Sequence, residues 1–282
     1  MTINRKKILI TGSGGMLGNY VDFGVRTTHK DLDVQDLNSV RASCKKHMPK
    51  VILHLAAATD LAECEQNPEK AYQINSVGTY NIALVAREIG AQVVYISTCS
   101  VFDGEKDGPY IEDDVPNPQS QYGHSKYLGE LAVSGMSSNH IIARAGWMLG
   151  GGPEKDHKFV AKILEQLNKS SIEVVNDKQG SPVYGKDFID KILQLVEEGN
   201  TGVFHVVNDG APTRADIARE IIRITNASTK VIEIDTAKPT SFSTTYISGK
   251  NESMRSRTVS LRSWQEALAD YIQTEWGDMI KK

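Results

Sequence analysis

Short apolar runs and longer amphipathic stretches alternate along most of the chain. The apolar runs fall at residues 6–10, 51–58, 91–96, 141–144, 172–175, 203–207 and 231–234. The amphipathic stretches fall at residues 38–47, 69–90, 158–167, 186–198, 213–225 and 262–276. Short uninterrupted apolar runs are typical of strands buried in a parallel sheet, and apolar residues spaced three and four apart are typical of helices. The alternation therefore predicts an α/β fold, a Rossmann-type doubly wound parallel sheet.

The glycine run at residues 150–152, followed by Pro153, interrupts this pattern. We expect residues 1–145 and about 185–207 to form one domain, because the amphipathic stretch at 186–198 and the strand after it suit a return to the main sheet. Residues of about 146–184 and 208–282 then form a smaller C-terminal α/β lobe.

A glycine-rich turn follows the first apolar run. Gly12, Gly15 and Gly18 stand in Gly-x-x-Gly-x-x-Gly spacing between a predicted strand and a short predicted helix that ends near residue 24. In this context Gly12 makes the tight turn, Gly15 lets the backbone approach a pyrophosphate, and Gly18 lets the helix pack on the strand. The alternative is a flexible glycine-rich loop without a ligand. The cofactor residues expected in the turn are Gly12, Gly14, Gly15, Met16, Leu17 and Gly18. We therefore expect the domain of residues 1–145 and about 185–207 to bind NAD(P), and the lobe of about 146–184 and 208–282 to bind the substrate.

Basic side chains accompany the second predicted strand, residues 25–28. No carboxylate stands at its end to bind a ribose 2′-hydroxyl, and Arg26 and His29 occur there instead. Basic residues suit a 2′-phosphate, so the sequence favours NADPH, with NADH possible. The alternative is a solvated basic loop. We expect Asp33 to accept a hydrogen bond from the adenine amino group and Val34 to pack on the adenine ring.

Small and polar residues follow the next two predicted strands. Ala56, Ala57 and Ala58 end the run at 51–58 and leave room for a cofactor. Ser97 ends the run at 91–96, and Asn75 lies on the predicted helix at 69–90. Ligands bind at the carboxyl ends of strands in doubly wound sheets, so we assign these residues to the cofactor site as well.

Three residues carry the candidate chemistry. Tyr122 and Lys126 are four positions apart, which places both on one face of a helix. A nearby ammonium favours the phenolate and lowers the pKa of a tyrosine, which makes it a usable acid or base near neutral pH. Thr98 follows the fourth predicted strand and should meet the cofactor and this helix at one place.

Composition excludes several other classes of protein. The chain of 282 residues has a net charge of -3, which favours neither nucleic acid nor an anionic membrane as a partner. No apolar run is long enough to span a membrane or to serve as a signal segment. The three cysteines are far apart and form neither a disulfide framework nor a metal site. We expect a cytoplasmic protein without a metal.

These motifs, in this order, resemble the extended short-chain dehydrogenase/reductases. Within them the chain is similar to the dTDP-4-dehydrorhamnose reductase group over nearly its whole length. The further matching residues are Val101-Phe102-Asp103-Gly104, Arg144-x-x-Trp147, Asp177-x-Gln179-Gly180-Ser181-Pro182 and Gly202-Val203-Phe204-His205-Val206.

The resemblance implies a reaction, namely hydride transfer from a reduced nicotinamide to C4 of a nucleotide-activated 4-keto-6-deoxy sugar in deoxysugar or surface polysaccharide biosynthesis. It implies that Tyr122 gives its proton to the developing alkoxide. Lys126 holds the nicotinamide ribose and lowers the tyrosine pKa, and Thr98 places the carbonyl oxygen.

The residues that face the sugar depart from this family pattern. Cys99 and Ser100 replace the usual Asp-Tyr pair, and Ser256 follows Arg255 where the group has proline. We therefore expect that the sugar or its nucleotide differs from that of the rhamnose pathway. The substrate residues expected in this sequence are Thr98, Cys99, Ser100, Trp147, Arg255 and Arg257.

Other interpretations stay open for several of these residues and for the function. Arg255 and Arg257 suit a bidentate grip on the diphosphate or a plain surface loop, and Trp147 suits a sugar contact or packing. A dehydratase is disfavoured because Cys99 and Ser100 cannot replace its Asp-Glu pair. A nucleotide-sugar 4-epimerase and a non-catalytic NADP-binding regulatory subunit remain alternatives, and a homodimer is possible.

Overall fold

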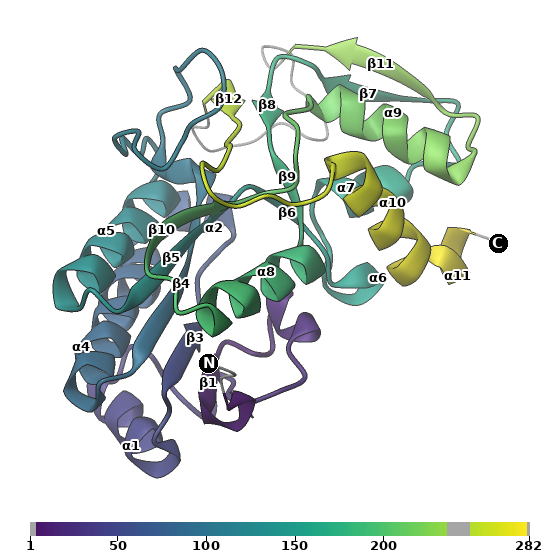
Figure 1. The fold of residues 1–282 in the computed structure, drawn as a ribbon. Coiled ribbons are helices and arrows are strands. Elements are labelled where there is room, and N and C mark those ends of the chain that lie inside the picture. The colour runs from purple at the N-terminus through teal and green to yellow at the C-terminus, as the bar shows by residue number, and fades with distance from the viewer. Residues whose placement is uncertain (1–3, 236–248, 281–282) are drawn as a thin grey trace.

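A six-stranded parallel sheet forms the centre of the computed structural model, which describes residues 4–235 and 249–280 (Figure 1). Its strands are β1 (Ile8–Thr11), β2 (Val25–Arg26), β3 (Val51–His54), β4 (Gln92–Thr98), β5 (His140–Ala145) and β10 (Gly202–Val206). They are hydrogen-bonded in the order β10-β5-β4-β3-β1-β2. All neighbours run parallel, which confirms the doubly wound α/β fold expected from the sequence.

Three helices cover one face of the sheet, as Figure 1 shows on its left side. They are α1 (Leu37–His47), α4 (Thr79–Ile89) and α5 (Gln121–Met136). Their apolar sides pack on Leu9, Ile52 and Tyr95 of the strands, all of them fully buried. Alternate residues of a strand point to opposite faces, so the neighbours of these residues belong to the other side of the sheet.

The other face is covered by α8 (Gly185–Glu197) and by a single turn of 3-10 helix, η2 (Leu17–Tyr20). Phe188 and Ile192 of α8 are buried against Ile8, Ile10 and Leu53 of the strands. Both faces are therefore apolar, which explains why the strand sequences are continuous apolar runs rather than alternating ones.

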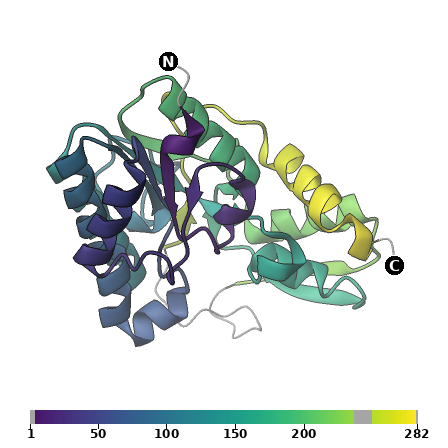
Figure 2. The same cartoon turned by 90° about the horizontal axis from the view of Figure 1, so that it is seen from below.

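A second lobe lies to the right of the sheet in Figures 1 and 2 and has its own apolar core. Its strands pair as β6 (Trp147–Leu149) with β9 (Pro182–Tyr184), β7 (Ser171–Val175) with β11 (Lys230–Ile234), and β8 (Gln179–Gly180) with β12 (Asn251–Glu252). Its helices are α6 (Gly152–Lys155), α7 (Phe159–Leu164), α9 (Arg214–Thr225), α10 (Trp264–Glu275) and α11 (Gly277–Ile280). Capping boxes at Thr213 and Ser263 begin α9 and α10.

Two elements differ from the expectation. The helix expected after the glycine-rich turn is only the η2 turn, because Gly24 with φ +72° already leads the chain into β2. The helix expected over residues 69–90 consists of α3 (Pro68–Tyr72), a π-helical turn η3 (Gln73–Gly78) and α4, preceded by the separate α2 (Leu61–Gln66). The wider turn lets Asn75 reach the loop after β3, as described below.

Candidate active site

The site lies where the carboxyl ends of β1, β3 and β4 meet. These three strands are neighbours in the sheet. The strand β2 lies on one side of β1, and β3 and the later strands lie on the other side, so the order in which strands are added reverses at β1. Such a switch point opens a crevice in doubly wound sheets. The glycine-rich turn follows β1, Ala56 to Ala58 follow β3, and Thr98 ends β4. The fold thus brings together segments that are distant in sequence.

The glycine-rich turn is tightly built at its two ends. Gly12 has φ +65°, and a Cβ there would lie 2.5 Å from the backbone nitrogen of Ala56. A Cβ on Gly18 would lie 1.9 Å from the carbonyl oxygen of Ser13. A Cβ on Gly15 would meet only the Gly12 oxygen at 3.4 Å, and Gly14 and Gly15 are exposed. The middle of the turn therefore offers bare backbone to a ligand, as a dinucleotide pyrophosphate requires.

The remaining two residues of the turn, Met16 and Leu17, are half-buried. Leu17 packs against the apolar core between the sheet and α8. A contact of either residue with the cofactor stays a prediction.

Arg26 lies over this turn, at the end of β2. Its Nη2 donates to the carbonyl oxygen of Gly18 at 3.2 Å and to that of Ser13 at 3.5 Å. His29 is exposed, and its Nδ1 lies 3.7 Å from Asp33 Oδ1. A guanidinium beside the phosphate-binding turn is well placed for a 2′-phosphate.

Asp33 and Val34 lie further along this edge of the site. The Asp33 carboxylate accepts from the backbone N–H of Gln35 at 3.0 Å. Val34 is buried, and a Cβ on Gly78 would lie 2.7 Å from its Cγ2. The Val34 side chain therefore packs under the η3 turn, and its contact with adenine stays a prediction, as does the hydrogen bond of Asp33 with the adenine amino group.

Asn75 connects two parts of the site. Its Oδ1 accepts from the N–H of Ala58 at 2.8 Å, and its Nδ2 donates to Ala58 O at 3.0 Å and to Ser125 Oγ at 2.9 Å. Asn75 is fully buried and its amide is fully engaged. Asn75 therefore ties the loop after β3 to helix α5, and its contact with the cofactor stays a prediction. Ala56, Ala57 and Ala58 are half-buried along this loop.

Ser97 supplies a test of whether a cofactor fits. Its Oγ is buried without a hydrogen-bond partner among the described residues. A buried hydroxyl without a partner is costly unless a ligand or water completes it. Together with the bare backbone of Gly14 and Gly15, this donor set fits a dinucleotide. Within residues 4–235 and 249–280, no three His, Cys, Asp or Glu side chains gather as a metal site.

Thr98, Tyr122 and Lys126 converge as expected. Helix α5 begins after Ser120, whose Oγ accepts from the N–H of Gly123 at 3.0 Å. Tyr122 is half-buried, and its hydroxyl lies near that of Thr98, which lowers the pKa of the phenol. The Thr98 Oγ1 also accepts from the N–H of Ser100 at 3.2 Å, which fixes the hydroxyl at the end of β4.

Lys126 is buried below Tyr122 on the same helix face. Its Nζ lies 4.2 Å from the centre of the Tyr95 ring, and Tyr95 Oη donates to the Lys126 carbonyl oxygen at 3.1 Å. Burial lowers the pKa of Lys126 to about 7, against the opposing effect of Glu130. Lys126 therefore lies one helical turn after Tyr122 on α5, and its side chain packs against Tyr95 of β4.

The electrostatics of Tyr122 differ from the expectation. Burial raises the pKa of Tyr122 above its ordinary value, and the nearby Thr98 hydroxyl lowers it by less. The expected net lowering of this pKa is therefore wrong, because the effect of burial dominates. A raised pKa keeps the phenol protonated, which suits a proton donor.

The substrate side contains residues that sequence reasoning missed. Trp147 is half-buried, and its Nε1 donates to Glu252 Oε2 at 2.6 Å. The guanidinium of Arg214 lies 4.4 Å from the centre of the indole ring. No local signal identifies Glu252 or Arg214, because each approaches Trp147 only through the packing of the second lobe.

Cys99 and Ser100 begin the loop after β4. Cys99 exposes only 5 % of its surface and packs in a small apolar cluster with Phe102 and Met254. Burial raises the pKa of its thiol. Ser100 is half-buried beside Thr98, and its Oγ accepts from Thr98 Oγ1 at 3.3 Å. The structure shows packing for Cys99, and a substrate contact of either residue stays a prediction.

The two arginines expected at the diphosphate lie on the segment after β12. Arg255 is exposed, and its backbone N–H donates to Tyr110 O at 2.9 Å. Arg257 is exposed and its guanidinium pairs with Asp113 on the loop before α5. Binding of a diphosphate by these two residues stays a prediction. Arg257 would first have to leave its ion pair with Asp113, and exposed ion pairs of this kind are weak.

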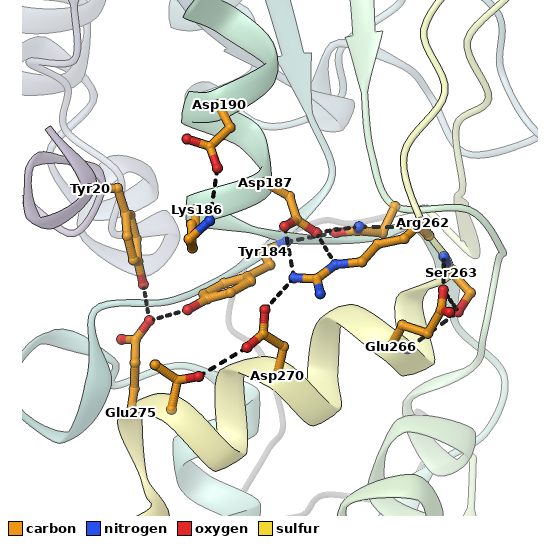
Figure 3. A network of polar contacts seen from close by, with 12 residues as sticks. Tyr20, Tyr184, Lys186, Asp187, Asp190, Arg262, Ser263, Glu266, Asp270 and Glu275 are labelled. Atoms are coloured by element: carbon orange, nitrogen blue, oxygen red, sulfur yellow. Dashed lines mark hydrogen bonds and ion pairs between the residues drawn. The ribbon is translucent and has the colours of Figure 1, made fainter.

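A polar network joins the glycine-rich turn to the second lobe (Figure 3). Tyr20 of η2 donates to Glu275 Oε1 at 2.7 Å, and Tyr184 donates to the same oxygen at 2.6 Å. Arg262 binds both carboxylate oxygens of Asp187 at 2.8 Å. Sequence reasoning missed this network, since its members are far apart in the chain.

The chain is similar to known proteins over nearly its whole length. The family described as "RmlD substrate binding domain" matches residues 6–276. The spore coat polysaccharide biosynthesis protein SpsK of Bacillus subtilis is 32% identical over 277 residues, which cover 95% of this chain and 97% of that protein.

Two solved structures are similar over nearly the whole chain. A dTDP-4-dehydrorhamnose reductase from Clostridium acetobutylicum is 32% identical, has a TM-score of 0.87, and is matched over 98% of this chain and 99% of that one. The dTDP-4-dehydrorhamnose reductase of Bacillus anthracis, solved in complex with NADP, is 28% identical with a TM-score of 0.88 over 95% of this chain and 99% of that one.

Proposed function

The chain belongs to the family described as the RmlD substrate binding domain, and from that premise we propose that it is a sugar-nucleotide reductase. It reduces the C4 keto group of a nucleotide-activated 4-keto-6-deoxy sugar with NADPH, in deoxysugar or surface polysaccharide biosynthesis. The observation that carries the proposal is the convergence of Thr98, Tyr122 and Lys126 beside the glycine-rich turn. NADH is a possible second cofactor.

The chain's own residues manage the proton and the geometry. Bound NADPH supplies the hydride that goes to C4 of the sugar. The Thr98 hydroxyl holds the carbonyl oxygen, and Tyr122 gives its proton to that oxygen as negative charge develops on it. The ammonium of Lys126 stabilises the tyrosinate that remains until solvent protonates it again. A donor held in this way accelerates the reaction by typically about 10²–10⁴-fold.

The test is oxidation of NADPH by the purified protein, followed by absorbance, with freshly prepared dTDP-, GDP-, UDP- and CDP-linked 4-keto-6-deoxy sugars. We expect turnover with at least one of them. Tyr122→Phe should lower kcat by at least about 10²-fold while NADPH binding is retained. Tyr127→Phe is the matched control, because Tyr127 is the next tyrosine of the same helix and packs in the apolar cluster beside Cys99.

Three outcomes of this test contradict the proposal. Full activity of Tyr122→Phe overturns the catalytic role. Tightly bound cofactor that returns to its starting redox state points to an epimerase. Binding of NADPH without turnover of any sugar points to a non-catalytic subunit.

We further propose that two copies of the chain associate through α4 and α5. Four large apolar side chains are exposed on η3, α4 and α5, namely Val77, Tyr80, Leu128 and Leu131, with exposed fractions of 40%, 43%, 44% and 48%. Exposed apolar patches of adjacent elements mark interfaces. Light scattering coupled to gel filtration tests this, and Leu131→Asp should convert the dimer to a monomer.

We place the reaction in the cytoplasm. The proposal rests on Cys44, Cys64 and Cys99, which are buried free thiols rather than disulfides. No helix within residues 4–235 and 249–280 is both long and apolar enough to cross a membrane.

A further inference from the structure

A buried ion pair stands directly behind the lysine of the site. Glu130 lies one helical turn after Lys126 on α5, so the two side chains share one helix face. Arg144 of β5 binds Glu130 through two hydrogen bonds, from Nε to Oε1 at 2.9 Å and from Nη2 to Oε2 at 2.7 Å. The side chains of Arg144 and Glu130 expose only 4% and 5% of their surface. The carboxylate is therefore held rigidly at a fixed place in the protein interior.

A buried ion pair of this kind is poorly explained by stability alone. The cost of removing two charges from water often exceeds their attraction, and apolar residues of similar volume can replace such a pair without loss. The position of this pair is therefore informative. It joins the helix that carries Tyr122 and Lys126 to the strand beside β4, and Arg144 stands opposite Ser97 in the register of β4 and β5.

Apart from the pair of Glu130 and Arg144, four titratable groups surround Lys126, and none of them carries a charge near neutral pH. Burial lowers the pKa of His54 on β3 to about 3, so its imidazole is neutral. Burial raises the pKa of Cys64 on α2 to about 11, so it is a thiol. The phenols of Tyr95 on β4 and Tyr122 on α5 have raised pKa values and stay protonated.

The acidic residues of α2 do not compensate the charge of the Lys126 ammonium. Glu65 Oε1 accepts from the backbone N–H of Gln121 at 2.7 Å, at the first turn of α5. Glu130 is the only acidic residue of α5, and it lies one helical turn from Lys126 on the same face. Its attraction opposes the burial that drives Lys126 to lose its proton.

We propose that Glu130, held by Arg144, is a positioning residue that keeps Lys126 in its ammonium form beside Tyr122. The proposal rests on the proposed function, since it assigns a purpose to the lysine of that site. Glu130 touches neither substrate nor cofactor and acts through Lys126. Arg144 fixes the carboxylate in place by binding both of its oxygens.

The test is the pH dependence of kcat/KM in Glu130→Gln. Lys126 acts in its protonated form, so activity falls as pH rises through its pKa. A nearby opposite charge shifts a pKa by about one unit or more. The alkaline limb of the profile is the decline of kcat/KM at high pH, and loss of the Glu130 charge should move this limb to a pH about one unit lower. The variant should then be roughly tenfold less active than the wild type above the limb and nearly unchanged below it. In Lys126→Met the limb should disappear, which assigns it.

Two further variants keep the test decisive. Glu130→Gln leaves Arg144 without its partner and can fail to fold, so Glu130→Met combined with Arg144→Met replaces the pair by apolar side chains. This double variant should again show the lowered limb. Glu88→Gln is the matched control, because Glu88 forms a similar two-bond pair with Arg41 on the surface. Its profile should coincide with that of the wild type.

An unchanged alkaline limb, with kcat/KM reduced equally at every pH, overturns the proposal and leaves the pair a structural role. A second measurement separates this failure from that of the proposed function. If no sugar is turned over by the wild type, the same limb is measured in the pH dependence of NADPH binding, followed by nicotinamide fluorescence. A limb that is absent there, or that Glu130→Gln leaves in place, also overturns the inference.

Discussion

We expect the side chain of Arg26 to select NADPH over NADH. It is exposed, and its guanidinium is held at the edge of the glycine-rich turn by the carbonyl oxygens of Gly18 and Ser13. These two bonds use one nitrogen, Nη2, and a guanidinium has further N–H groups to offer. A 2′-phosphate on the adenosine ribose can accept hydrogen bonds from these N–H groups, whereas a 2′-hydroxyl gains much less binding energy from them.

Replacement of Arg26 should therefore affect the two cofactors unequally. A hydrogen bond to a charged group contributes about 1.5–3 kcal/mol, so Arg26→Ala should raise the Kd of NADPH by about tenfold to hundredfold. The Kd of NADH should change by no more than about threefold. Nicotinamide fluorescence measures both constants. Lys45→Ala is the control, because Lys45 is an exposed basic residue of α1 that has no assigned role in the site. An equal loss for both cofactors would show that Arg26 stabilises the turn and does not read the phosphate.

At the scale of the element, helix α5 determines where the reactive groups stand. Its contact with β4 is unusually close, since a Cβ on Gly129 would lie 2.3 Å from Tyr95 Oη and 2.8 Å from Asn75 O. A Cβ on Gly123 would lie 2.2 Å from Ser100 O. The helix thus presses glycines against the strand end that carries Thr98, and this contact sets the distance between Thr98 and Tyr122.

Two glycines of α5 should respond in opposite ways to the same substitution. Gly135 is exposed near the helix end with nothing within 4 Å of a Cβ, so Gly135→Ala should stabilise the protein by about 0.5–1 kcal/mol. Gly129→Ala should destabilise it by about 1–3 kcal/mol, because the helix must move away from Tyr95. Urea unfolding measures both values. The displaced helix should also lower kcat, and a Gly129→Ala variant with unchanged stability and kcat would contradict the close packing.

The same elements show what the sequence could and could not predict. The sheet strands and α5 were predictable, because buried parallel strands are continuous apolar runs and Tyr122 and Lys126 share a helical face. The π-helical turn at Gln73–Gly78 was not, since it depends on the bonds of Asn75 to Ala58 and Ser125. The pKa of Tyr122 was also missed, because burial follows from tertiary packing and not from a spacing.

Contacts between segments distant in sequence were hardest to foresee. The bond from Trp147 to Glu252 spans 105 positions, and the bond from Tyr20 to Glu275 spans 255. No periodicity or short motif encodes such pairs, since each member alone looks like an ordinary polar residue. The division of the chain into two domains at 1–145 with 185–207, and 146–184 with 208–282, stays a prediction.

At the scale of the whole molecule, one carboxylate connects the two lobes. Glu275 ends helix α10, and its Oε1 accepts from Tyr20, two residues beyond Gly18, and from Tyr184 of β9 (Figure 3). The Tyr20 hydroxyl also accepts from the N–H of Gly151 at 2.6 Å. Burial, reinforced by the bond to Glu275, raises the pKa of both phenols, so both remain donors at any physiological pH.

This arrangement predicts that a substitution in α10 weakens the binding of the cofactor. Glu275→Ala removes two charge-assisted hydrogen bonds and should lower the free energy of unfolding by about 2–4 kcal/mol. Because Tyr20 directly follows the glycine-rich turn, its release should raise the Kd of NADPH several-fold, while kcat at saturating cofactor changes little. Gln273→Ala, an exposed change on the same helix, should alter neither quantity.

A double-mutant cycle locates the effect. Tyr20→Phe removes one of the two donors, so its effect on NADPH binding should repeat most of that of Glu275→Ala, and the two changes together should add little more. Tyr184→Phe lowers stability by a comparable amount but leaves the turn in place, so NADPH affinity should persist. If Tyr20→Phe and Tyr184→Phe weaken NADPH binding equally, the loss reflects a general loosening of the fold. If only Tyr20→Phe does so, the second lobe holds the phosphate-binding turn in its binding conformation through a single oxygen of Glu275.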